Sequence, residues 1–222
     1  GFAKLISTFA FVTGVMSVSV GQTPLFPGDL AIVGINANNS CIATTADEIS
    51  FICFKNITVN TQIDLTDNGY ERQFAGQWGE GEGFNRLIRS GGTILAGTVI
   101  TVRMNGGMPV VVSPDAAWTV LAPFGASVNM NSMGDQLFFS QGGTWTNPAG
   151  ANNTTYSGTM LYAFNTKTVW TSHAGLPTGN TQDSALPPGS LCFSMNPTST
   201  SDYVKFTDLV LGGAFTTRTQ RA

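Results

Sequence analysis

The sequence predicts an all-β protein built as a β-sandwich, with an extended apolar arm at its N-terminus. Short runs of β-branched and aromatic residues recur along the chain, separated by turns that carry Gly, Pro and Asn. No window shows a sustained helical period with caps at both ends. Apolar residues make up 42% of the 222 residues and charged residues only 10%, which is typical of a secreted β-protein with a hydroxyl- and amide-rich surface.

The candidate strands follow one another from residue 30 onward. LAIVGI indicates a buried strand, EISFICF is apolar on both faces, and TQIDLT alternates with period two. Asp67-Asn68-Gly69 is a strong turn signal, and residues 70–86, rich in Gly, Gln and Glu, are expected to be irregular. Many short strands at this spacing predict an immunoglobulin-like or jelly-roll-like sandwich. The expected strands are residues 30–35, 48–54, 61–66, 98–102, 108–112, 118–121, 136–140, 158–164, 190–195 and 203–206.

The chain divides into three segments. Residues 1–22 form the apolar arm, or a segment that resembles a secretion signal. Residues 23–28 (TPLFPG) are a hinge, because two prolines and a glycine stop any regular element. Residues 29–222 form the sandwich domain, a length that suits one large domain.

The opening segment, GFAKLISTFAFVTGVMSVSVGQ, supports two interpretations. As a signal peptide, Lys4 is the basic region, an apolar run follows, and small residues precede Gln22. As a retained arm, it is rich in strand-forming residues, and MSVSV alternates with period two. Such an arm could extend over roughly 50 Å at about 3.3 Å per residue. It could then complete the sheet of a neighbouring subunit, head to tail.

We take the arm as the first hypothesis. Its apolar side chains would make the contacts with the neighbouring copy of the chain. These predicted assembly residues are Leu5, Ile6, Phe9, Phe11, Val12, Val15, Met16, Val18 and Val20.

Three cysteines allow at most one internal disulfide. They are Cys41, Cys53 and Cys192, and none forms a C-x-x-C pair that would indicate a zinc or redox site. The chain therefore holds either one disulfide and a buried free thiol or three buried thiols. The sequence does not choose among the pairings.

The order of motifs resembles a family. GDLAIVGINANN, DEISFICF, NTQIDLTDNGY, GEGF and LAGTVITV, followed by MGDQLFFSQG, TMLYAFNTKTVW, NTQDSALPPG and DYVKF, are similar to a β-sandwich domain of secreted and cell-surface proteins from Bacteroidota-type bacteria. The early part also looks like the lamin-tail type of immunoglobulin-like domain. The match covers about residues 28–206 and departs from the family in the loop 36–46 and in its cysteines. The resemblance implies an extracellular, non-catalytic module displayed on a surface.

Carboxylates around the DNGY turn form the one candidate metal site. Asp64, Asp67, Glu80 and Glu82 supply the oxygen ligands that calcium prefers, although their spacing does not match an EF-hand. The competing interpretation is structural, with Asp67 and Asn68 stabilising a tight turn. We expect no other cofactor.

No catalytic constellation emerges from the sequence. His173 is the only histidine, and no G-x-S-x-G elbow accompanies it, so we expect no enzymatic activity. Aromatic residues could form a sugar-binding platform, but most of them are expected in the core or at an interface. These aromatics are Tyr70, Trp78, Trp118, Trp145, Tyr156, Tyr162 and Trp170, and sequons occur at Asn38, Asn56, Asn152 and Asn153.

The predicted function is a structural subunit of an extracellular filament or surface assembly, joined by the donor-strand-like arm. The partners are copies of the chain itself. A net charge of −3 with scattered basic residues argues against nucleic-acid binding, and no membrane span is expected in the mature form. The alternative is a monomeric secreted module that binds a glycan or calcium and whose signal peptide is cleaved.

Overall fold

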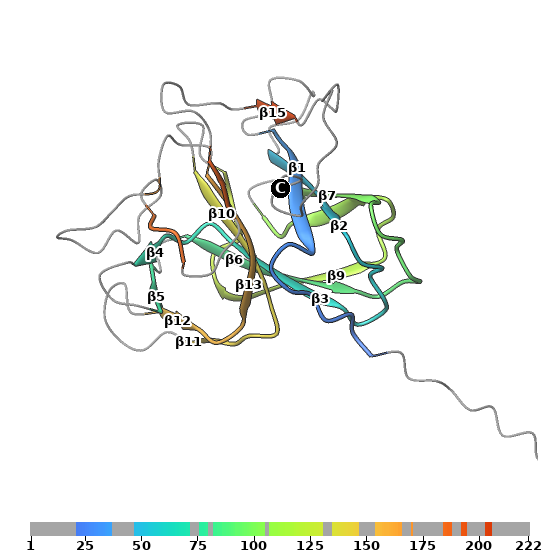
Figure 1. The fold of residues 1–222 in the computed structure, drawn as a ribbon, viewed down its shortest axis with the longest axis horizontal. Helices are drawn as coiled ribbons and strands as arrows, with labels where there is room; N and C mark the ends of the chain where they lie inside the picture. Colours follow the sequence, from blue (N-terminus) through green and yellow to red (C-terminus); the bar gives the residue numbers. More distant parts are fainter. Residues whose placement is uncertain are drawn as a thin grey trace, which may run out of the picture.

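The strands stack in three layers (Figure 1). The computed structural model describes residues 21–36, 47–71, 76–79, 82–104, 107–130, 135–146, 154–165, 170, 184–187, 192–194 and 203–205. Each regular element in these ranges is a β-strand. The all-β sandwich predicted from the sequence is confirmed. The predicted arm lies outside these ranges except for its last two residues, 21 and 22.

A five-stranded antiparallel sheet forms one outer layer. Its order is β15 (Tyr203–Lys205), β1 (Leu30–Asn36), β2 (Asp47–Cys53), β7 (Val99–Met104) and β8 (Val110–Ser113). Alternate residues of β2 are buried, as the period-two pattern of a half-covered strand requires. One face of this sheet therefore lies on the core, and the other faces outward.

A six-stranded sheet forms the middle layer. Its order is β14 (Cys192–Ser194), β13 (Thr159–Asn165), β10 (Gln136–Gln141), β3 (Gln62–Thr66), β6 (Gly83–Arg89) and β9 (Trp118–Gly125). All neighbours are antiparallel except β13 and β14, which are parallel. The third layer holds β11 (Trp145–Thr146), β12 (Thr154–Tyr156), β5 (Gln77–Trp78) and β4 (Tyr70–Glu71).

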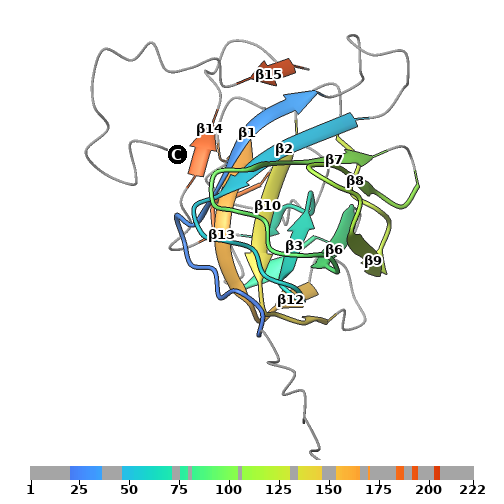
Figure 2. The same ribbon diagram turned by 90° about the vertical axis from the view of Figure 1, so that its right-hand side faces the viewer.

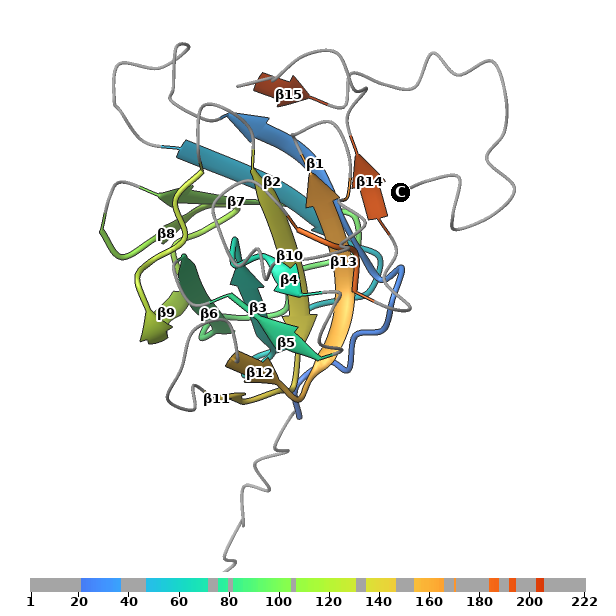
Figure 3. The same cartoon turned by 90° about the vertical axis from the view of Figure 1, so that its left-hand side faces the viewer.

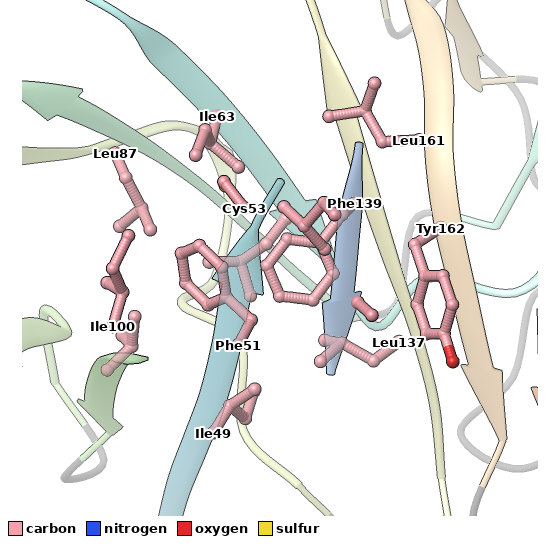
Figure 4. Close-up of a cluster of buried hydrophobic side chains, with 14 of the residues drawn as sticks. Ile49, Phe51, Cys53, Ile63, Leu87, Ile100, Leu137, Phe139, Leu161 and Tyr162 are labelled. Atoms are coloured by element: carbon pink, nitrogen blue, oxygen red, sulfur yellow. The ribbon is translucent and has the colours of Figure 1, made fainter. Parts of the chain in front are cut away.

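The main core fills the space between the five- and six-stranded sheets, which cross in Figure 2. Phe51 of β2 and Phe139 of β10 meet at its centre, with their ring centroids 5.0 Å apart (Figure 4). Ile49, Leu87 and Leu137 surround them, all fully buried. The alternating apolar residues of both sheets thus build one continuous core.

A second core lies on the other face of the six-stranded sheet, where the small sheet covers it (Figure 3). Phe138 and Ala163 point to this side and pack with Tyr70 and Trp78. The middle sheet is therefore covered on both faces. This explains why all six residues of β10 are buried.

Every strand expected from the sequence is present, with ends shifted by a few residues. The expectation that residues 70–86 are irregular is wrong, because β4, β5 and the start of β6 lie there. Two-residue strands are too short to produce a period. Gly83 also hides the start of β6, since glycine is uncommon in strands.

Candidate functional site

The DNGY turn holds two loops to the end of the middle sheet. The two carboxylate oxygens of Asp67 accept hydrogen bonds from the backbone N–H groups of Gly83 and Asn129, at 2.6 and 2.8 Å. Asn68 accepts from the N–H of Glu82 at 3.0 Å and donates to the carbonyl of Gly83 at 3.2 Å. Both side chains are fully buried. Both side chains therefore have a structural role, because they bond to residues 82, 83 and 129. The expected tight turn at residues 67–69 stays a prediction.

The acidity of this turn is altered by its burial. Burial raises the pKa of Asp67 to about 8, although the hydrogen bonds from the two backbone N–H groups lower it. The nearby Glu82 carboxylate raises it further. Burial also raises the pKa of Glu82 to about 7. Near neutral pH the pair therefore carries less negative charge than two ordinary carboxylates.

Asp64 belongs to a different network, although it is only three residues away. Arg86 donates to both of its oxygens, from Nε at 2.7 Å and from Nη2 at 2.8 Å. The Tyr156 hydroxyl donates to the same carboxylate at 2.8 Å. Asp64 is fully buried, and these donors occupy it. Its hydrogen bond raises the pKa of Arg86, and burial next to this carboxylate raises the pKa of Tyr156.

The calcium hypothesis gains little from these positions. Asp64 is held by an arginine and a tyrosine, and Asp67 by two backbone donors. Glu80 lies outside the described residues, so the four-carboxylate site stays a prediction. Within the described ranges, no group of three or more His, Cys, Asp or Glu side chains could hold a metal ion.

The aromatic residues form a packed cluster rather than an open platform. Trp78 contacts Tyr70, Phe138 and Trp145 edge to face, at centroid distances of 5.0 to 5.4 Å. Tyr156 lies 5.0 Å from Trp145. Tyr70, Trp78 and Tyr162 are buried, and the other predicted platform residues are half-buried. Three of the seven aromatics are therefore core residues, and the other four pack against the two cores.

Of the other chemical candidates, Cys53 is a buried free thiol at the end of β2. Burial raises its pKa to about 12, so its thiol is not a nucleophile at neutral pH. Cys41 and His173 lie outside the described residues, as do three of the four sequon asparagines. Asn56 is the described one, and its side chain accepts a hydrogen bond from the N–H of Ala96 at 2.9 Å.

Residues 21–23, the base of the predicted arm, are attached to the sandwich by a group of threonines. Thr23 donates its N–H to the Thr61 hydroxyl at 2.9 Å and its hydroxyl to the Asn56 carbonyl at 2.8 Å. The Thr58 hydroxyl donates to the carbonyl of Gly21 at 2.9 Å. These bonds join a segment at the start of the chain to the turn that follows β2.

The next residues deepen the attachment. Leu25 is buried in the main core, and its N–H donates to the side chain of Gln141 at 2.7 Å. Gln141 in turn donates to the carbonyl of Thr23 at 3.0 Å. The expected hinge, residues 23–28, thus packs against the sandwich through Thr23 and Leu25. The sequence contained no signal for Gln141, which lies 116 residues away from Leu25.

Apolar side chains are exposed close to this base. The Phe26 ring lies under the Lys55 ammonium, with Nζ 4.7 Å from the ring centroid, and Lys55 pairs with the buried Asp29 at 2.8 Å. Leu95 stands 68% exposed next to Ala96, which bonds to the side chain of Asn56. Phe26 thus lies beside Lys55, and Leu95 precedes the residue that bonds to Asn56.

Comparisons with known proteins returned no match: no family model, no curated protein and no solved structure is similar to this chain. The family resemblance noted from the motifs accordingly stays a prediction. Within the described ranges, no helix has the length and apolar character that crossing a membrane would require.

Proposed function

We propose that this protein is a structural subunit of an extracellular filament or surface assembly. Each subunit is joined to the next by its apolar N-terminal arm, residues 1–22. The carrying observation is the base of the arm, where Thr23 and Leu25 bind the sandwich through Thr61 and Gln141. An arm that starts from a fixed point on its domain has less conformational freedom to lose when it docks to a partner.

The chemistry of the arm supports the same proposal. Apart from Lys4, residues 1–20 carry no charged side chain, and nine of them are the apolar assembly residues named above. Burying such a segment away from water is favourable, and each large apolar side chain contributes about 2 kcal/mol to the free energy of association when it is covered. A head-to-tail contact of this kind need not close on itself, so it can build a fibre or a layer.

The test compares the full chain with an arm variant. Replacing Val18 and Val20 by Asp places two charges in the period-two stretch and leaves the sandwich unchanged. We expect filaments or large particles of the full chain in electron microscopy and sedimentation velocity, and monomers of the variant. Intact-mass analysis of the native assemblies should show that residues 1–22 are retained.

One outcome favours the alternative function. Native protein that is monomeric and begins near Gln22 would mean that the segment is a cleaved signal. The assembly proposal would then be refuted, and the monomeric binding module for a glycan or calcium would replace it. Calorimetric titration with Ca²⁺ would then be the next measurement.

A further inference from the structure

Strand β8 forms an open edge of the five-stranded sheet. Among the described strands it stands at the end of the sheet order and pairs with β7 alone. An edge strand presents unpaired backbone N–H and C=O groups and can receive another strand. The side chains of β8 suit that role, because the strand consists of three valines and a serine.

The exposed valines are unusual for an edge that faces water. Val110 is 51% and Val112 39% exposed, whereas Val111 between them is buried in the core. Edge strands are protected by short length, proline, bulges or outward charges. β8 is short, lies between two prolines and faces a register shift in β7, but it carries no charged side chain. Here the outward positions of β8 are apolar. Val99 of the neighbouring strand β7 is exposed as well.

The length of this edge matches one part of the arm. Pro109 and Pro114 bound β8, and proline has no N–H to donate, so four residues are available for pairing. The arm contains one stretch with strict period two, residues 16–20 (MSVSV), which is five residues long. Five residues suffice to pair with all of β8 and to place apolar side chains beside Val110 and Val112.

The position of β8 favours pairing between copies. The blue segment that leads into β1 starts at the lower end of the molecule and rises along one side in Figures 2 and 3, while β8 lies on the opposite side. The base of the arm is held to the turn after β2 by Thr23 and Thr58. Donor and acceptor are thus separate surfaces, as a head-to-tail contact needs.

We propose that β8 is the acceptor edge for the arm of a second copy of this chain, with residues 16–20 adding a sixth strand to the five-stranded sheet. This inference rests on the proposed function, because it assumes that the arm assembles subunits. It adds where the arm docks: backbone pairing to β8 provides the ladder, and Val110 and Val112 provide apolar contacts.

The experiment uses three full-length variants. The edge variant, V110K/V112K, keeps its arm but has two charges on β8. The arm variant, V18D/V20D, keeps its edge. The control variant, L121K, replaces a comparably exposed residue of β9, an edge strand of the six-stranded sheet.

We expect the edge and arm variants each to be monomeric when alone, and an equimolar mixture to form dimers that do not grow. The edge variant then supplies only an arm, and the arm variant only an edge. The control variant should assemble like the unmodified chain. Each exposed valine contact is worth about a tenfold change in affinity, so the edge variant should raise the assembly concentration by roughly a hundredfold.

The outcomes separate the two proposals. If the edge variant assembles normally while the arm variant does not, β8 is not the acceptor and the proposed function stands. If the arm variant assembles, the proposed function itself fails. A mixture that stays monomeric, or an L121K variant that also fails to assemble, overturns the assignment of β8.

A second measurement does not depend on the variants folding. Amide hydrogen exchange of the unmodified chain, compared between assemblies and dilute monomer, reports pairing at β8 directly. We expect slower exchange within residues 110–113 in the assemblies. Unchanged exchange there would refute the proposal even if the edge variant were unfolded.

Discussion

Removing Arg86 should destabilise the sandwich strongly, because it would leave a buried carboxylate without its cation. Arg86 makes two hydrogen bonds to Asp64, which is fully buried, and a third to the carbonyl of Gly143 at 2.7 Å. Breaking a buried pair by removing one partner costs about 3–5 kcal/mol. Tyr156 still donates to Asp64, so we expect Arg86→Met to cost about 3 kcal/mol at pH 7.

Urea unfolding followed by tryptophan fluorescence measures this loss. The matched control is Arg103→Met, since Arg103 also pairs with a carboxylate across strands, that of Glu48 at 2.7 Å. That arginine is 39% exposed, compared with 21% for Arg86, and Glu48 is not fully buried. An exposed pair contributes about 0.2–1 kcal/mol, so the control should remain close to the unmodified protein.

A second substitution identifies the cause. Without Arg86 the buried Asp64 carboxylate would have no cation beside it, so removing its charge should recover stability. Adding Asp64→Asn to Arg86→Met should therefore restore part of the loss at pH 7. A loss no larger than that of Arg103→Met, or no recovery with Asp64→Asn, would refute the reasoning.

Three other predictions concern the turn and the thiol. Gly83→Ala should lower the free energy of unfolding by about 2 kcal/mol or more, because a Cβ there would lie 2.2 Å from backbone atoms. Gly92→Ala is the control and should change that free energy little, because a Cβ there would have no atom within 4 Å. Urea titration compares the two variants. The free energy of unfolding should fall as the pH rises from 5 to 8, since the pKa values of Asp67 and Glu82 are raised in the folded state, and Glu82→Gln should reduce this slope in unfolding curves measured across pH. Cys53 should resist iodoacetamide in the native protein and react after unfolding, as peptide mass mapping would show; fast native labelling would contradict its burial.

The sequence predicts the strands of the main core well, because they carry a local signal. EISFICF and LAIVGI became β2 and β1, and a run of apolar residues needs only its neighbours to be recognised. The small outer sheet was not predicted. Its strands are only two or three residues long, which is too short to show a period. They are covered through contacts such as that of Trp78 with Phe138, residues 60 positions apart, which local sequence patterns do not reveal.

The candidate sites show the same division. The sequence indicates local bonding at Asp67 and Asn68, and the Asn68 N–H donates to the Thr66 hydroxyl two residues earlier. The pairing of Asp64 with Arg86 and Tyr156 was not recognisable, since Tyr156 lies 92 residues from Asp64 and reaches it only across two sheets. A carboxylate that resembled a metal ligand in the sequence is an ion-pair partner in the fold.

By itself, the sequence determined the fold class, the order of the main strands and the apolar character of the opening segment. These properties follow from residue type and spacing, which act locally. Only the tertiary structure decided which carboxylates are buried, how Thr23 and Leu25 bond to the sandwich, and that Val110 and Val112 remain exposed at an edge. Those outcomes depend on which strands become neighbours, and sheet pairing joins residues that are distant in the chain.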